Sequence, residues 1–211
     1  MQIVATFTPV PPLLSADHLQ PAWTAAAPLA LAYLWNGDAA PATLATTARV
    51  LWTKTDLWFA FACAYEELDV DTGVVDTTAR RHGLWDRDVC EAFVWSPAEA
   101  SAESYKELEV APTGQWCDIA VRRPRVDVDH GWRSGMATAA TVDATAGLWR
   151  VTMRVPFLAF GAVPQRGDAW RANLFRVSRD RGERRYLALA PTGAPTPDYH
   201  VPQAFVPLVF A

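Results

Sequence analysis

The amino-acid sequence predicts an all-β fold, an antiparallel β-sandwich of the immunoglobulin or jelly-roll type with one or two short helices. Three observations predict it: many short runs alternate between apolar and polar residues, turn residues separate these runs, and helical periodicity is weak. The length of 211 residues suits a single domain over 1–211. A domain of this size buries about 70% of its unfolded surface, so its core needs no disulfide or structural metal.

The alternating runs place the strands in chain order. Prolines lie between the runs, where strands tolerate them. Short helices are expected at 156–160 and at 14–20, behind Ser15. The predicted strands and hairpins are 48–65 (turning at 53–56), 88–95, 104–121 (turning at 112–114), 137–157 (turning at 143–147), 168–180, 184–191 and 207–211.

The composition is weakly acidic and rich in tryptophan. The net charge is −4, the pI is about 5.5, and the arginines are scattered along the chain. A nucleic-acid binder would carry a basic surface, so we expect no nucleic-acid partner and no binding to an anionic membrane. Most of the ten tryptophans should lie in the core, while one or two are candidates for a ligand-binding face.

Cysteine usage and the N-terminus bear on the compartment. Cys63, Cys90 and Cys117 are widely spaced within apolar runs, which predicts buried free thiols in a reducing compartment. Residues 1–14 lack a basic region, a long apolar segment and a cleavage site, and no run of 18 apolar residues occurs in the chain. These features predict a cytoplasmic protein, or a secreted one if a signal peptide has been removed.

The stretch GLWDRDVCEAFVW, residues 83–95, places acidic residues in a strand that otherwise resembles core. Asp88 and Glu91 have opposite parity, so at most one of them faces the same side as the preceding indole. Glu91 alternates with apolar residues, and a carboxylate there would be partly buried and would need a partner. Arg171, Arg176 or a sugar hydroxyl would supply that partner.

Two further glutamates occupy the next predicted strand. Glu107 and Glu109 share one face of it with Tyr105, because side chains alternate with a period of two. If this strand neighbours residues 88–95, Glu91 approaches Glu109. Glycoside hydrolases use two carboxyl groups about 5 to 10 Å apart, one of them with a raised pKa. Acids on a solvated sheet face are the simpler explanation of the same pattern.

An acidic segment, YEELDVDTGVVD, follows the first hairpin. Glu66, Asp69 and Asp71 offer carboxylate oxygens near alternate positions, which makes them candidate calcium ligands. The segment lacks the glycine placement and terminal acid of an EF-hand loop, and a solvated acidic loop explains it as well. Histidines have no paired spacing that indicates zinc, and no glycine-rich phosphate loop follows a strand.

Four segments occur in an order that is similar to the family 9 carbohydrate-binding modules. They are LWDRDVCEAFVWSP, YKELEVAPTGQWCD, WRANLFRV and DYHVPQAFVPLVF, and the resemblance extends over about residues 15–211. It implies a β-sandwich of the DOMON-like superfamily and a role in saccharide binding. In such modules two aromatic rings clamp a terminal sugar residue, and polar side chains hold its hydroxyls.

The resemblance also implies site residues. Trp85 matches the first aromatic ring and Glu91 the carboxylate. Tyr199 falls at the second ring, where a tryptophan is usual. Glu109 stands where the family has an arginine, which replaces a positive donor with an acceptor. Asn173 and His200 match positions that would donate hydrogen bonds to the same ligand.

We therefore expect a non-catalytic carbohydrate-binding domain. The apolar C–H face of a pyranose lies flat on an aromatic ring, and a carboxylate accepts charge-assisted hydrogen bonds from its hydroxyls. In a competing interpretation, Trp85 caps the core and Asp88 fixes the loop.

Three other functions remain open. The resemblance includes haem-binding cytochrome domains with Met and His axial ligands, for which the chain offers Met136, Met153, His82, His130 and His200. A glycoside-processing enzyme would use Glu91 and Glu109, and a protein-interaction module is the last alternative.

Overall fold

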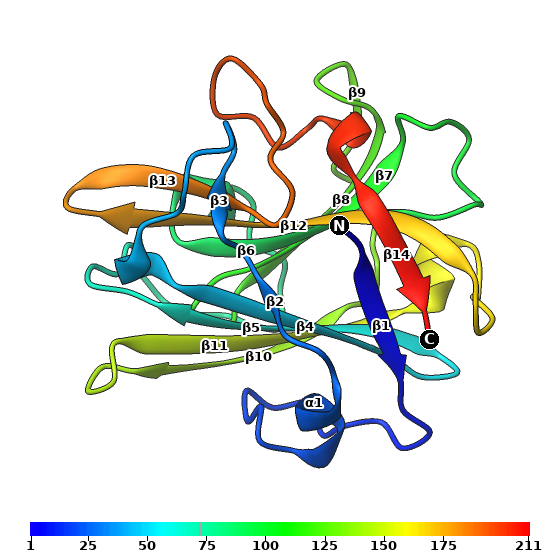
Figure 1. The fold of residues 1–211 in the computed structure, drawn as a ribbon, viewed down its shortest axis with the longest axis horizontal. Helices are drawn as coiled ribbons and strands as arrows, with labels where there is room; N and C mark the ends of the chain where they lie inside the picture. The colour runs from blue at the N-terminus through cyan, green and yellow to red at the C-terminus, as the bar shows by residue number, and fades with distance from the viewer. Residues whose placement is uncertain (72) are drawn as a thin grey trace.

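The structure is a computed structural model that describes residues 1–71 and 73–211. Within these residues the chain forms a β-sandwich of fourteen strands with one short α-helix and four 3-10 turns (Figure 1). This confirms the predicted fold class. None of the helices in this part of the chain has the length and apolar character needed to cross a bilayer.

Sheet A is the upper layer in Figure 1. Its long central strand β12 pairs with β6 on one edge, and with β14 and then β13 on the other. From β6 the sheet continues through β7 and β8 to β9, and β3 pairs with β13. The strands of sheet A are β3 (Tyr33–Leu34), β6 (Val89–Trp95), β7 (Tyr105–Val110), β8 (Trp116–Arg123), β9 (Asp127–Asp129), β12 (Ala169–Asp180), β13 (Glu183–Ala188) and β14 (Val206–Phe210).

Sheet B is the lower layer and is built mainly from two hairpins. Its order is β10, β11, β5, β4, with β2 paired to β4. All of these pairs are antiparallel, as predicted. The strands of sheet B are β2 (Leu29–Ala30), β4 (Thr46–Trp52), β5 (Asp56–Ala64), β10 (Ala137–Asp143) and β11 (Leu148–Pro156).

Strand β1 (Ile3–Phe7) joins the two sheets and departs from the antiparallel prediction. Its first part, from Ile3 to Ala5, pairs in parallel with β14 of sheet A. Its last part, Thr6 and Phe7, pairs in parallel with β4 of sheet B. A single strand therefore passes from one layer to the other, so the two layers are hydrogen-bonded together at one edge.

The main core lies between the sheets. In strands β6 and β7 of sheet A, every second side chain points into this core, including Cys90 of β6 and Leu108 of β7. The side chains between them point outward. Cys63 and Cys90 face each other across the layers, with their sulfur atoms 3.5 Å apart. All three cysteines are buried free thiols, as predicted.

Of the two predicted helices, one is confirmed and one is misplaced. The turn η3 (Phe157–Phe160) forms where 156–160 predicts a short helix. The segment 14–20 is not helical, because the Gln20 side chain bonds to surrounding loop groups and the helix α1 begins at Pro21. The remaining elements are α1 (Pro21–Ala25), η1 (Ala42–Leu44), η2 (Leu84–Asp86) and η4 (Pro202–Ala204).

Candidate functional site

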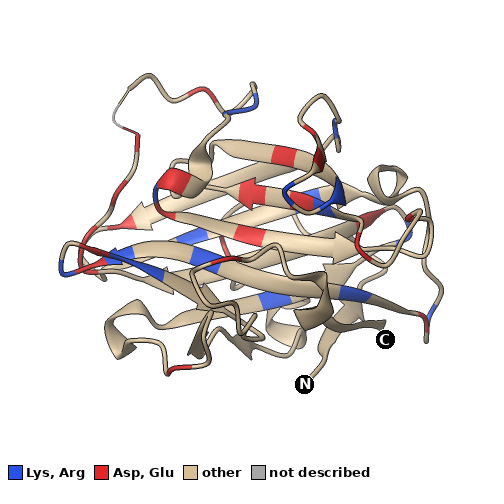
Figure 2. Ribbon diagram, turned by 90° about the horizontal axis from the view of Figure 1, so that it is seen from above, with Lys and Arg blue, Asp and Glu red and all other residues tan. Residues whose placement is uncertain are grey.

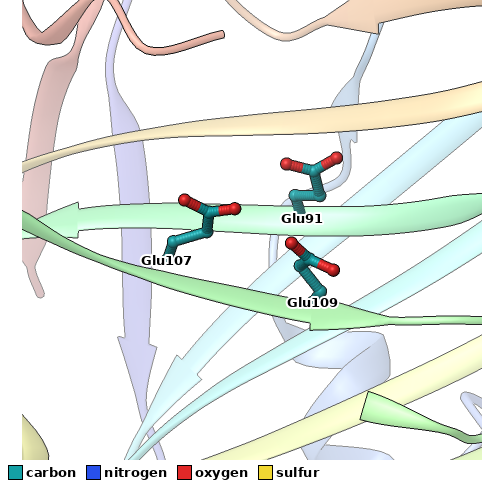
Figure 3. Close-up of side chains that lie close together, drawn as sticks. All are labelled: Glu91, Glu107 and Glu109. Atoms are coloured by element: carbon teal, nitrogen blue, oxygen red, sulfur yellow. The ribbon is translucent and has the colours of Figure 1, made fainter. Parts of the chain in front are cut away.

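The outer face of sheet A carries a second apolar cluster, which surrounds three glutamates. In the register of the sheet, Glu91 of β6 lies directly opposite Glu109 of β7 and, on its other side, opposite Phe175 of β12. Glu107 is two residues from Glu109 and therefore shares its face. Figure 3 shows the three carboxylates converging from the two neighbouring strands, and Figure 2 shows acidic positions within the strands of this layer.

We call Glu91, Glu107 and Glu109 the glutamate triad. Their exposed fractions are 3%, 4% and 0%. One carboxylate oxygen from each lies within 4.8 Å of the others. Burial raises the pKa of Glu107 to about 7, and it raises the pKa values of Glu91 and Glu109 well above their ordinary range, with mutual repulsion adding to the effect.

Neither arginine predicted to pair with Glu91 does so. Arg176 points into the other face of sheet A, where its guanidinium donates to the carbonyls of Leu44 and Ala64. Arg171 donates to the Ala102 carbonyl and lies over an indole elsewhere on the sheet. The prediction fails because Arg176 has the opposite parity to Glu91, whose direct cross-strand neighbour on β12 is the residue before it.

A cavity of about 360 Å³ opens above the triad. Glu91 and Glu107 form part of its floor, together with apolar side chains of β8 and β12, whereas Glu109 lies beside them and does not line it. The walls come from segments far apart in the sequence. They include Trp85 of η2, Arg125, Val128 and His130 around β9, Arg184 and Tyr186 of β13, and the loop residues Asp198, Tyr199 and His200.

The two predicted aromatic residues both line this cavity. Trp85 is half-buried and follows Gly83, whose φ of 85° allows the tight turn into η2. Tyr199 is only 6% exposed; its ring stacks on Phe175 with centroids 4.1 Å apart, and its hydroxyl donates to the Arg176 carbonyl at 2.8 Å. Tyr199 is thus fixed by packing on one side and by a hydrogen bond at its tip.

The other predicted ligand-binding residues differ in their placement. Asn173 is fully buried and does not line the cavity; its amide group bonds to the backbone of Ala190 through both its nitrogen and its oxygen. His200 does line the cavity, and its Nδ1 is hydrogen-bonded to the Tyr105 hydroxyl. Burial, together with the positive charge of Arg125, lowers the pKa of His200 to about 4, so the ring is neutral at pH 7.

Several polar residues of the cavity are absent from the predicted ligand-binding set, among them Glu107, Arg125 and Arg184. Glu107 could have been predicted from the sequence, because the period of two places it on the same strand face as Glu109. Arg184 donates to the Trp85 carbonyl, and Arg125 pairs with Asp198 at 2.6 Å. Arg125 lies in the turn between β8 and β9, and Arg184 follows the turn between β12 and β13, where charged residues are common, so no local pattern distinguishes them.

The acidic segment after β5 is a separate feature, and arginines already occupy two of its predicted calcium ligands. Asp69 pairs with Arg87 and, at 2.8 Å, with Arg179, and these contacts lower its pKa against the effect of burial. Asp71 pairs with Arg81. Glu66 is exposed to solvent.

The residues considered as haem ligands lie on different sides of sheet A. Met136 and Met153 belong to the core between the sheets. His130 and His200 line the cavity on the outer face, and His82 packs edge-on against Trp85 at 4.6 Å. The sheet therefore separates both methionines from the two histidines that reach the cavity.

Comparison with known proteins gives likenesses in structure only. No protein-family model matches the chain, and no curated protein matches it significantly. A candidate carbohydrate-binding protein from Bacteroides uniformis superimposes with a TM-score of 0.76 at 16% identity, covering 100% of this chain and 99% of that one.

Two structures of a family 9 carbohydrate-binding module from Caldicellulosiruptor kristjanssonii also match, each with a TM-score of 0.69 at 12% identity. One is in complex with cellotriose and the other with glucose. Both matches cover 100% of this chain, and 93% and 96% of the other chain respectively. At these identities the likeness shows a shared fold.

Proposed function

We propose that this chain is a non-catalytic carbohydrate-binding domain of the family 9 type, within the DOMON-like superfamily, and that the saccharide occupies the cavity over sheet A. The observation that carries the proposal is the cavity itself, which is lined by Trp85 and Tyr199 together with two buried glutamates. Proteins that share this fold have been solved with glucose and cellotriose. The cavity volume of about 360 Å³ falls in the usual range for small-ligand sites.

The cavity combines the two kinds of contact that a sugar needs. Trp85 and Tyr199 offer apolar ring surface to the C–H faces of a pyranose. Glu91 and Glu107 accept hydrogen bonds from hydroxyl groups, and Arg184 at the wall donates them. The rings supply most of the affinity, while the charged groups fix the orientation of the sugar.

A binding role accounts for the carboxyl groups better than glycoside hydrolysis does. A retaining or inverting glycosidase needs two carboxyls whose pKa values are pushed apart, one remaining ionised as nucleophile or base. Here the pKa values of all three glutamates are raised. The predicted pair Glu91 and Glu109 also lacks access to substrate at one member, since Glu109 does not line the cavity.

The test is saccharide titration of the wild-type protein and of two tryptophan variants. Glucose, cello-oligosaccharides and a glycan array are screened first, and affinity is then measured by calorimetry. Trp85→Ala should abolish binding while the melting temperature changes little, because the indole is half-buried at the cavity wall. Trp95→Ala is the matched control, since Trp95 of β6 is also half-buried but does not line the cavity, and this variant should retain binding.

Three outcomes would contradict the proposal. A wild-type protein that binds no saccharide on the array would remove it. A Trp85→Ala variant that binds normally but is strongly destabilised would instead assign the indole to the core. Hydrolysis of aryl glycosides by the wild-type protein would show that the domain is catalytic.

A further inference from the structure

The glutamate triad has unmet hydrogen-bonding capacity in a buried position. When the three groups are ionised, neither carboxylate oxygen of Glu109 has a hydrogen-bond donor, although the residue is 0% exposed, and Oε2 of Glu107 also lacks one. Across residues 1–71 and 73–211, no lysine or arginine forms an ion pair with any of the three carboxylates. The basic neighbour is His200, whose Nδ1 lies 3.9 Å from Glu107 and is engaged by a tyrosine hydroxyl.

Full ionisation of such a cluster is costly unless a positive charge is supplied. Three ionised carboxylates in a water-poor environment repel one another, and each also loses its hydration. Protons relieve the repulsion by neutralising the groups, and a protonated carboxyl can donate a hydrogen bond to its neighbour, whereas a bound cation relieves the repulsion while all three carboxylates stay ionised as ligands. An ordinary structural role would provide hydrogen-bond donors from the surrounding chain, as Asp88 receives from two backbone N–H groups.

The spacing of the triad suits a single calcium ion. Two oxygens bound to one ion are separated by at most twice the ion–oxygen distance, roughly 5 Å for calcium. One oxygen from each glutamate lies within 4.8 Å of the other two. Calcium accepts six to eight oxygen ligands in flexible arrangements, so three carboxylates leave positions to be filled by water or hydroxyl groups.

We propose that Glu91, Glu107 and Glu109 bind a divalent cation, with calcium preferred, at the floor of the cavity. Two of the three ligands line the cavity, so the open coordination positions of the ion face it. Hydroxyl groups of a saccharide would complete the coordination. This last step rests on the proposed function, whereas cation binding itself does not.

The experiment compares the triad with the acidic segment that follows β5. Protein stripped with a chelator is titrated with calcium chloride, with magnesium chloride and with sodium chloride of equal ionic strength. Melting temperature and calorimetric heat are recorded. Glu109→Gln removes a triad carboxylate that does not touch the cavity, Glu107→Gln is a second triad variant, and Glu66→Gln is the matched control in the loop.

Calcium should raise the melting temperature of the wild type and of Glu66→Gln, and both triad variants should lose this rise. Without calcium, Glu109→Gln should melt at or above the wild-type temperature, because a neutral amide replaces a buried, repelled carboxyl. That increase separates ligand loss from misfolding. The proposal is overturned if no calcium binding is detected, if the triad variants keep the calcium effect, or if Glu66→Gln loses it.

Saccharide titration in chelator and in excess calcium then tests the coordination by sugar. Saccharide binding that appears only with calcium supports it. Saccharide binding unchanged by the chelator overturns the coordination while leaving the proposed function intact. Calcium binding to the triad with no saccharide binding in either condition overturns the proposed function and leaves the cation site.

Discussion

At the scale of single residues, Glu109 lies directly opposite Glu91, which places a third carboxylate on the outer face of sheet A. The positive charge near the cavity comes from Arg125 and Arg184, on its walls. Two of the buried glutamates lie on the floor and the arginines lie on the walls, where Arg125 pairs with Asp198, so the floor favours ligands that present hydroxyl groups or a cation to it.

Tyr199 combines a packing role with a place in the cavity wall, and a single substitution separates the two. Tyr199→Phe keeps the ring but leaves the Arg176 carbonyl without its 2.8 Å hydrogen bond. We expect the free energy of unfolding to fall by about 1–3 kcal/mol, with saccharide affinity unchanged. Urea unfolding and calorimetry measure the two quantities. Weaker saccharide binding at unchanged stability would show instead that the hydroxyl contacts the ligand.

His18 makes stability depend on pH. It is 8% exposed and hydrogen-bonded to Thr152, and burial together with Arg150 lowers its pKa from 6.5 to about 4, with Arg49 adding to the effect and Asp17 opposing it. Between pH 6.5 and 4, His18 is protonated in the unfolded chain but stays neutral in the folded chain. The free energy of unfolding therefore falls as the pH falls.

His18→Gln should remove this contribution, because glutamine does not titrate. The difference in free energy of unfolding between the wild type and His18→Gln should change by about 1 kcal/mol for each pH unit below 6.5 and stay constant above pH 7. Denaturant unfolding from pH 4 to 8 provides the measurement. Parallel pH profiles for the two proteins would be inconsistent with the lowered pKa.

At the scale of elements, Asp88 holds the acidic loop against β12. Its carboxylate accepts 3.0 Å hydrogen bonds from the backbone N–H groups of Asp69 and Arg179, and it is 1% exposed. Asp88→Ala would leave both partly buried donors unpaired, so we expect a loss of roughly 2 kcal/mol in the free energy of unfolding. Asp86→Ala, at an exposed position nearby, should change stability little. Equal effects in thermal melts of the two variants would argue against this role.

Strands in which apolar and polar residues alternate strictly were predictable from the sequence. Segments in which side chains compete for backbone hydrogen bonds, and very short strands, were not. The hairpin of β4 and β5 forms as expected, because one parity of each strand can be buried between the layers. A short helix was predicted at residues 14–20. The Gln20 side chain instead donates a hydrogen bond to the loop backbone, and the helix α1 begins at the next residue, Pro21. β2 and β3 are two residues each, too short to leave a periodic pattern.

At the scale of the whole molecule, β1 couples the two sheets into one cooperative unit. Because β1 pairs with β14 through its first residues and with β4 through its last, neither sheet can separate without breaking its bonds. We expect one thermal transition, with far-UV circular dichroism and tryptophan fluorescence coinciding. Deletion of residues 1–7 should lower both midpoints together by roughly 10 °C. Two separate transitions in the intact chain would contradict this coupling.

The sequence by itself determined the fold class, the facing parity of Glu91, Glu107 and Glu109, and the burial of the three thiols. Each of these follows from alternation along a single strand, which is a local property. Only the tertiary structure decided that Trp85 and Tyr199 line one cavity and that the Asn173 side chain is hydrogen-bonded to the backbone of Ala190. It also decided that, in the part of the chain that the structure describes, no lysine or arginine pairs with the carboxylates of the triad. These depend on which strands become neighbours and how loops cross the sheet, and spacing along the chain does not encode such distances.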